Sequence, residues 1–152
     1  MNNELSTPAD RSAVDVSLLL LRIIVGVIFM AHGAQKLFGA FGGNGLERTV
    51  EMMGGGVVPY LVVIGEFFGG IGLVFGFLSR FSAASLIVIM IGAIVKVHGS
   101  KGFFSSAGGF EYNLALIGLL LPIFICGPVR LSIGQFFLPK STKTGRPVVV
   151  LE

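Results

Sequence analysis

Charged residues are scarce in this sequence, at 12% of the chain against about 25% in a typical soluble domain. Hydrophobic residues make up 53%, and the mean hydropathy is +0.90. So few charges among so many apolar residues exclude an ordinary soluble domain. The composition predicts a protein that crosses a lipid bilayer several times.

Cysteine and tryptophan are scarcer still. The single cysteine, Cys126, excludes an internal disulfide, a CxxC redox pair and a thiolate-held iron–sulfur cluster within this chain. Tryptophan is absent, so phenylalanine and the two tyrosines must form any aromatic belt at the membrane surface. Basic residues are scattered and form no stripe, so the net charge of +3 does not indicate a nucleic-acid partner.

Four hydrophobic segments are near the ~20 residues that a helix needs to span a bilayer. They cover residues 16–38, 59–77, 81–98 and 111–126, and the last is short and contains Pro122. The tight joint "LSR" between the second and third segments predicts an antiparallel hairpin. We therefore predict an all-α, polytopic, four-helix up-down membrane bundle.

Two longer connections, both rich in glycine, join the first segment to the second and the third to the fourth. In the first connection, Asn44 and Glu47 resemble a capping box and predict a short interfacial helix at 46–53. Each connection links an odd segment to the next even one, so both lie on one side of the membrane. Basic residues outside the spans are more numerous on the other side, where they are Arg11, Arg80, Arg130, Lys140, Lys143 and Arg146. By the positive-inside rule, both termini are expected in the cytoplasm.

The chain is accordingly divided into a cytoplasmic tail at 1–15, a membrane domain at 16–132 and a second cytoplasmic tail at 133–152. Residues 151–152 also fit a cloning junction. The first segment has a rival interpretation as a signal peptide, with Ala31 and Gly33 at the cleavage site. A retained helix is favoured over cleavage, because the preceding tail has a single arginine and Arg22 interrupts the apolar region.

Ionisable side chains inside the predicted spans are candidates for function, since each costs several kcal/mol in a bilayer. Arg22 lies ~9 Å from the cytoplasmic end of the first span, and Glu66 lies ~11 Å from the opposite end of the second. Both side chains are long enough to close much of the remaining gap, so the sequence allows an Arg22–Glu66 ion pair if the two helices face each other correctly. Such a pair would serve either chemistry or the register of the helices.

Two histidines are expected at the same depth. His32 and His98 both lie ~25 Å from the cytoplasmic starts of their spans. Level histidines on two helices suit haem ligation, a bound quinone or a proton relay. Haem b is disfavoured, because histidines near an interface are commonly only hydrogen-bonded. Two histidines also leave a zinc site short of ligands unless Glu66 or Glu111 completes it, so no metal is assigned.

Further polar residues gather at the level of the histidines, namely Gln35, Lys36, Glu111, Tyr112 and Asn113. With Arg22 they form the predicted ligand-binding or structural cluster around the catalytic candidates His32, His98 and Glu66. Glu111 has an equally good interpretation as a helix cap, because it begins the fourth span. Lys96 precedes His98 by two residues and is expected to point the other way, toward the interface.

Glycines recur on the predicted packing faces. Gly26 and Gly33 share a face of the first span with Arg22, Phe29 and Lys36. The second span carries a seam of four glycines, which are Gly65, Gly69, Gly72 and Gly76. Small residues of this kind let membrane helices approach closely, and they also make a homo-oligomer or a complex with another subunit plausible.

Longer stretches resemble a known family. They are "LLLRIIVGVIFMAHGAQKLFGAFGGNGLERTVEMMG", "IGEFFGGIGLVFGFLSRFSA", "VKVHGSKGFF" and "GGFEYNLALIGLLL". Across residues 18–132 they resemble the DoxX family of small four-helix membrane proteins. The resemblance implies a bacterial inner-membrane protein, and the family's namesakes include a small subunit of a thiosulfate:quinone oxidoreductase. More distant relatives include endoplasmic-reticulum cargo receptors, which are not enzymes.

Two functional hypotheses follow. The first is a redox membrane subunit that holds a quinone headgroup beside His32 and His98 and works with a separate redox partner. The second is a non-enzymatic membrane module that binds a small ligand, a lipid or a partner protein. A transporter is less favoured, because the sequence has no internal repeat. The substrate, the cofactor and the redox partner stay open.

Overall fold

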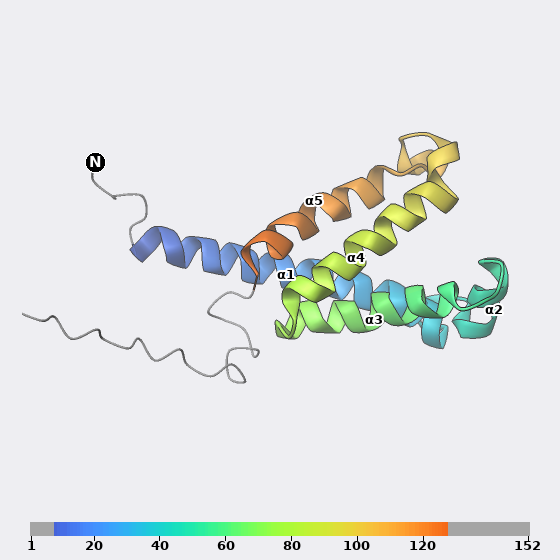
Figure 1. Ribbon diagram of the computed structural model, residues 1–152, viewed down its shortest axis with the longest axis horizontal. Coiled ribbons are helices and arrows are strands. Elements are labelled where there is room, and N and C mark those ends of the chain that lie inside the picture. The colour runs from blue at the N-terminus through green and yellow to red at the C-terminus, as the bar shows by residue number, and fades with distance from the viewer. Residues whose placement is uncertain (1–7, 128–152) are drawn as a thin grey trace, which may run out of the picture.

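The computed structural model describes residues 8–127 and contains five α-helices (Figure 1). They are α1 (Pro8–Phe38), α2 (Gly45–Met52), α3 (Val58–Phe75), α4 (Ser79–Ala93) and α5 (Glu111–Cys126). Residues 8–127 contain no strand, so the predicted all-helical class is confirmed for them. The C-terminal tail expected at 133–152, with its suspected cloning junction, lies outside the described residues.

Three stretches within the described range are long and apolar enough to cross a membrane: Ser12–Phe38, Val58–Phe75 and Ser79–Lys101. The fourth predicted span is the shorter apolar helix α5, whose 16 residues match the predicted bounds. Helix α1 begins at Pro8, earlier than the predicted start at residue 16. Proline is tolerated in a first helical turn, and no glycine or second proline interrupts the polar residues that follow.

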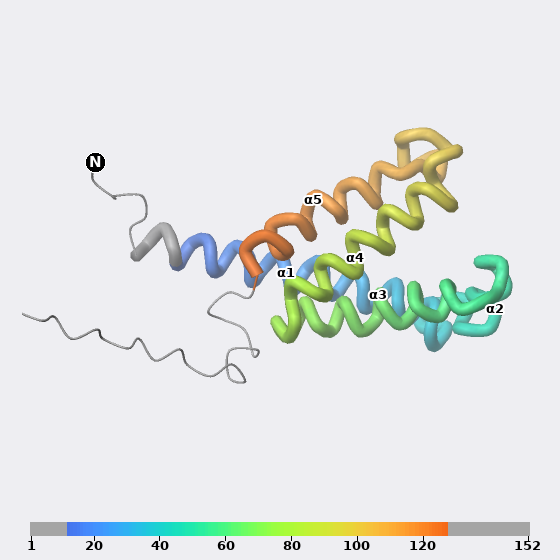
Figure 2. Tube along the Cα trace, viewed as in Figure 1, coloured from blue at the N-terminus to red at the C-terminus, as the bar shows by residue number. Residues whose placement is uncertain are grey.

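The long helices pack as two pairs, α1 with α3 and α4 with α5, and a tight turn links α3 to α4 (Figures 1 and 2). The pairs diverge toward the end that carries α2 and the segment 99–110, which we call the loop end. The turn between α3 and α4 confirms the predicted antiparallel hairpin. Its backbone is left-handed at Gly76, where φ is 71°, and at Leu78, where φ is 50°.

Helices α1 and α3 touch through their backbones. A Cβ atom added at Gly26 would lie 2.8 Å from the carbonyl oxygen of Gly70. One added at Gly33 would lie 2.6 Å from the Cα of Phe67. No side chain fits at these points, so the glycines fix how close the two helices come and which residues face each other.

The glycine seam of α3 divides between two structural roles. Gly65 and Gly69 face α4, where an added Cβ would lie 2.7 Å from Ile89 Cδ1 and 3.1 Å from Leu86 Cγ, respectively. Gly72 also faces α4, where it lies against Ser82. Gly76 instead ends α3 in the left-handed conformation, which glycine adopts without a steric penalty.

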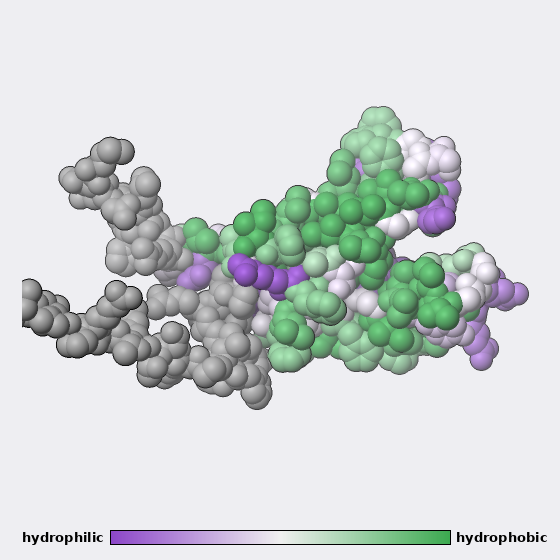
Figure 3. Space-filling model, in the orientation of Figure 1, coloured by the Kyte–Doolittle hydropathy of each residue, from purple (hydrophilic) through white to green (hydrophobic). Residues whose placement is uncertain are grey.

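Apolar side chains fill the core and cover the outside. The core draws on α1, α3, α4 and α5 and includes Val25, Phe29, Leu73, Leu86, Leu116, Leu120 and Ile123. Large apolar side chains such as Ile24, Leu61 and Val88 face outward, and Figure 3 shows that hydrophobic residues dominate the visible surface of the helices. A surface this apolar suits contact with lipid tails.

The predicted short helix is present, although the predicted cap was wrong. Helix α2 covers Gly45–Met52 against the expected 46–53. Asn44 makes no side-chain cap, because its backbone is already helical and its amide donates instead to Met52 Sδ at 3.5 Å. Thr49 is buried, and its hydroxyl donates to the carbonyl of Lys36 at 3.5 Å. This bond places α2 against the end of α1.

Arg80 holds the opposite end of the α4–α5 pair. Its Nη2 donates to the carbonyls of Ile125 at 3.0 Å and Cys126 at 3.4 Å, at the C-terminus of α5. A cation is favourable there, since the last carbonyls of a helix lack intrahelical partners.

We expect Arg80→Ala to lower the free energy of unfolding by about 1 kcal/mol, the size of one exposed charged hydrogen bond. Unfolding in mixed detergent micelles, followed by circular dichroism, measures the change. Arg48→Ala is the matched control, because Arg48 is an exposed arginine on α2 that makes no such bond within residues 8–127. Equal stability of the two variants would contradict the role given to Arg80.

Candidate functional site

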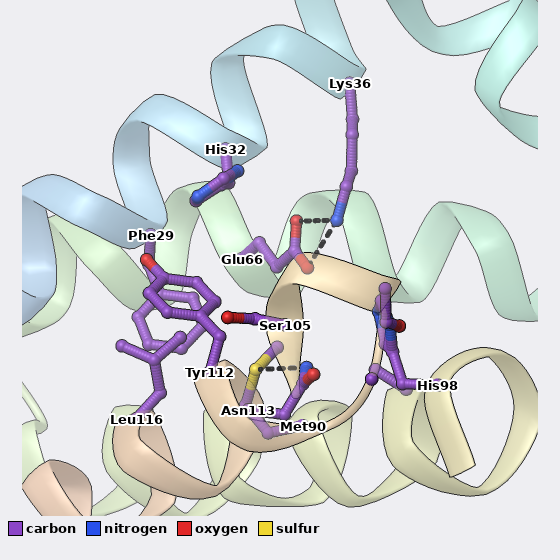
Figure 4. Close-up of a pocket in the computed structure, with 13 residues that line it drawn as sticks. Phe29, His32, Lys36, Glu66, Met90, His98, Ser105, Tyr112, Asn113 and Leu116 are labelled. Atoms are coloured by element: carbon purple, nitrogen blue, oxygen red, sulfur yellow. Dashed lines mark hydrogen bonds and ion pairs between the residues drawn. The ribbon is translucent and has the colours of Figure 1, made fainter. Parts of the chain in front are cut away.

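A polar cavity of about 400 Å³ lies at the loop end, between α1, α3, α4 and α5. Seven polar residues line it, namely His32, Lys36, Glu66, His98, Ser105, Tyr112 and Asn113 (Figure 4). Phe29, Met90 and Leu116 add apolar walls. The structure therefore brings the three catalytic candidates together with three members of the predicted polar cluster. Such a volume and such a mixture of surfaces are typical of small-molecule sites.

An ion pair forms one wall of the cavity. Lys36 Nζ lies 2.6 Å from Glu66 Oε1 and 2.5 Å from Oε2. The Glu66 side chain is 4% exposed and that of Lys36 is 33% exposed. The lysine therefore reaches from partly open space onto a buried carboxylate, and the two charges cancel inside the cavity.

The Arg22–Glu66 pairing left open above was wrong. Arg22 is buried in α1, but it lies fourteen residues from Lys36, or ~21 Å along the helix. Helices α1 and α3 run antiparallel with Gly33 against Phe67, so Glu66 is level with the loop end of α1. The contact of Gly33 with the backbone of Phe67 sets the register of α1 against α3, and this register places Lys36 beside Glu66.

His98 is held by a backbone carbonyl. Its Nδ1 lies 2.7 Å from the oxygen of Gly108. A carbonyl oxygen only accepts, so Nδ1 carries a proton and donates it. In the neutral ring, Nε2 is then the nitrogen with a free lone pair. The cavity thus contains a proton acceptor whose tautomer is set by the fold.

A wider turn that contains this histidine follows α4. Residues Ile94–His98 form a single π-helical turn, followed by a 3₁₀ turn at Gly99–Lys101. Turns of the π type carry one residue more than an α-helical turn and often occur at functional sites. His98 lines the polar cavity and Lys96 does not, while both line the apolar groove described below.

His32 and Tyr112 lie close together on one side of the cavity. Their ring centroids lie 6.2 Å apart with the planes tilted by 60°. Both side chains are exposed, and Figure 4 shows the Tyr112 ring below His32 on the opposite side of the cavity from His98. Hydrogen-bonding groups therefore stand on two opposed walls.

Asn113 is the buried polar residue of α5 at this level. Its side-chain amide donates to Met90 Sδ at 3.4 Å, and the residue is 6% exposed. This contact ties α5 to α4 directly beneath the cavity. Sulfur is a weak acceptor, so the amide is weakly satisfied within the protein.

Three members of the predicted cluster lie outside the cavity lining: Arg22, described above, Gln35 and Glu111. A Cβ added at Gly43 would overlap the backbone of Gln35, so the chain after α1 folds back tightly against that residue. Glu111 Oε2 accepts from the backbone N–H of Ser105 at 3.0 Å and from its hydroxyl at 3.1 Å. The carboxylate at the start of α5 thus organises the preceding segment, in agreement with a structural role.

The segment before α5 contributes cavity residues that sequence reasoning missed, namely Ser105, Gly108 and Gly109. Backbone bonds from Phe110 N to Gly102 O at 3.1 Å and from Glu111 N to Phe103 O at 2.8 Å close the segment on itself. Gly108 has a φ of 80°, which favours glycine. Glycine content marked this connection as irregular, but only its folding places the Gly108 carbonyl against His98.

An apolar groove of about 640 Å³ adjoins the polar cavity. It runs between α2, α3 and α4, and Lys36, Glu66, Ala93 and His98 line both spaces. Lys96 lines the groove. Within residues 8–127, no group of three or more histidine, cysteine, aspartate or glutamate residues is arranged to hold a metal ion.

The comparisons with known proteins agree with the membrane character of the chain. A family model described as DoxX matches residues 17–99. A Bacillus subtilis (strain 168) protein named "Putative oxidoreductase CatD" is 31% identical over 113 residues, covering 72% of this chain and 79% of the relative. The Escherichia coli (strain K12) "Inner membrane protein YqjF" is 30% identical over 128 residues, covering 83% of this chain and 95% of the relative.

A membrane protein of Mycobacterium tuberculosis (strain ATCC 25618 / H37Rv) is 25% identical over 140 residues, covering 85% of this chain and 86% of the relative. No solved structure matches the chain.

Proposed function

Because the chain belongs to the DoxX family of membrane proteins, we propose that it is a quinone-binding subunit of a membrane oxidoreductase. The observation that carries the proposal is the polar cavity, in which both histidines, Tyr112 and a neutralised ion pair meet at one end of apolar helices. The name of the Bacillus subtilis relative, which is an oxidoreductase name, agrees with this class of function.

The polar groups of the cavity fit the headgroup of a quinone and of its reduced quinol. The two oxygens at opposite ends of the ring accept hydrogen bonds as carbonyls and donate them as hydroxyls. His32 and Tyr112 stand on one wall, and His98, whose free Nε2 accepts from a quinol hydroxyl, stands on the other (Figure 4). Phe29, Met90 and Leu116 offer apolar contact to the ring.

His98 is suited to move a proton. Oxidation of a quinol releases two electrons and two protons, and in this proposal the electrons pass to a separate redox partner protein. The bond from Nδ1 to Gly108 leaves Nε2 of neutral His98 free to accept one proton from a hydroxyl. His32, which is exposed at the mouth, serves as the second proton partner.

We propose a matching topology. Helices α1, α3, α4 and α5 cross the membrane as a four-helix up-down bundle, and α2 lies at the interface. Helix α5 supplies the fourth crossing, since its 16 residues extend ~24 Å. Both termini are cytoplasmic and the loop end faces outward, as the distribution of basic residues favours. The inner membrane is the proposed location, as for the Escherichia coli relative.

Quinone binding to the full-length protein in detergent tests the proposal. Tyr112→Phe is expected to weaken the affinity for decylubiquinone about fivefold, the equivalent of one hydrogen bond of ~1 kcal/mol. Tyr60→Phe is a matched control, because Tyr60 is 43% exposed against 44% for Tyr112 and lines neither space. His32→Ala is expected to weaken the affinity for decylubiquinone about tenfold, and His98→Gln is expected to weaken that for the reduced decylubiquinol, whose hydroxyl donates to Nε2, about tenfold.

Isothermal titration calorimetry gives the dissociation constants, and organic extraction of freshly purified protein tests for bound quinone. Undiminished affinity in Tyr112→Phe and both histidine variants would overturn the proposed site. If the wild type neither binds nor retains a quinone, the alternative of a non-enzymatic module that binds another small ligand, a lipid or a partner protein takes its place.

A further inference from the structure

The apolar groove has exposed side chains on each of the three helices that form it. Its walls include Met52 from α2, Leu61 from α3 and Val88 from α4. These side chains are 69%, 63% and 68% exposed, respectively, so the groove is open to the bilayer. A groove lined by flexible and branched apolar side chains suits a hydrocarbon chain.

The groove and the polar cavity meet at one place. Lys36, Glu66, Ala93 and His98 belong to both linings. The ion pair stands between the two spaces, and the small side chain of Ala93 together with the π-helical turn leaves room beside it. A molecule that occupies both spaces must therefore have a polar end and an apolar end.

The charge of the cavity selects among such molecules. Both oxygens of Glu66 are within 2.6 Å of Lys36 Nζ, so the lysine is already neutralised. A phosphate headgroup would have to compete with the buried carboxylate for that lysine. A neutral head with hydrogen-bond acceptors meets no such competition.

We propose that the apolar groove holds the isoprenoid tail of the quinone whose headgroup occupies the polar cavity. The inference rests on the proposed function and extends it, because it states how the substrate enters. The head enters from the bilayer through the groove and passes Ala93 and His98 into the polar cavity, and the tail follows it into the groove between α3 and α4. Tail binding then adds affinity that a tailless quinone lacks.

Gly92 offers a way to fill the groove without disturbing the fold. It lines the groove, and a Cβ added there would meet no atom within 4 Å. Gly92→Phe therefore places a ring in the space proposed for the tail. Gly118→Phe is the matched control, since Gly118 is an exposed helical glycine of α5 with equally open surroundings and lines neither space.

The experiment compares two probes, decylubiquinone and the tailless ubiquinone-0, at one fixed detergent concentration. In the wild type and in Gly118→Phe we expect decylubiquinone to bind at least tenfold more tightly. In Gly92→Phe that ratio is expected to fall to near one, through loss of affinity for the tailed probe alone. Leucine fills less of the groove than phenylalanine, so the affinity ratio of Gly92→Leu is expected to lie between those of the wild type and Gly92→Phe. Circular dichroism and size-exclusion chromatography check that each variant is folded.

The outcomes separate the two proposals. If ubiquinone-0 binds but the tail adds nothing in the wild type, or if Gly92→Phe leaves the ratio unchanged, the groove assignment is overturned and the quinone site stands. Equal loss of both probes in Gly92→Phe also overturns it. Failure of the wild type to bind either probe overturns both proposals.

Discussion

Lys36→Met is expected to lower the free energy of unfolding by about 3 kcal/mol, because it leaves a buried carboxylate without its partner. Glu66 is 4% exposed on its side chain, and both of its oxygens bond to Lys36. The expected loss is at the lower end of the range for broken buried pairs, since Lys36 is one-third exposed (33%). Methionine keeps the length of the side chain, so the change removes charge and hydrogen bonds more than packing.

A double variant separates charge from shape. In Lys36→Met/Glu66→Gln no buried charge remains, and most of the lost stability is expected to return. Detergent-titration unfolding followed by circular dichroism suits all three proteins, because the chain has no tryptophan to report by fluorescence. A single variant as stable as the wild type would show that the pair contributes nothing to the fold.

Gly70→Ala is expected to cost about 3 kcal/mol, the upper end of the usual penalty for overpacking. A Cβ at this position would lie 2.7 Å from both the carbonyl oxygen of Gly26 and the backbone nitrogen of Met30. Neither backbone atom can turn aside as a side chain would. Helices α1 and α3 must therefore separate, and the same unfolding measurement detects the loss.

The control substitution, Gly118→Ala, is expected to change the free energy of unfolding in the opposite direction. Gly118→Ala meets nothing within 4 Å on α5. It is expected to raise the stability by up to about 1 kcal/mol, because alanine favours the helix over glycine. If the two substitutions change stability alike, the close approach of α1 and α3 does not limit the residue at position 70.

The helices could be predicted from the sequence because a bilayer imposes strong demands on length and composition. The bounds of α5 follow from the apolar run that begins at Glu111. Counting residues at a fixed rise predicted one level for His32 and His98, and both line the same cavity. The partner of Glu66 does not follow from such counting. It depends on the register of α1 against α3, which the contacts at Gly26 and Gly33 determine in three dimensions.

The π-helical turn and the hydrogen bond that hold His98 could not be predicted from the sequence either. Nothing in the letters "VKVHGSKGFF" marks a π-helical turn, since an extra residue in a turn reflects what packs around it. The acceptor on Gly108 lies ten residues away, in a segment closed by its own backbone bonds and by Glu111. Glu111 was predicted both as a cluster member and as a helix cap, and its bonds to Ser105 favour the structural role.

The short turn between α3 and α4 lies far from the polar cavity, so a rotation at the turn would displace the cavity end of the helices most. The turn and the Arg80 bonds lie at one end of the helices, and the polar cavity lies at the other. Helix α3 is 18 residues long, so it measures ~27 Å. A rotation of about 5° between the two helix pairs at the turn would shift the loop end by about 2 Å. A small angular change at Gly76–Leu78 would therefore displace the end of the helices where the polar cavity lies.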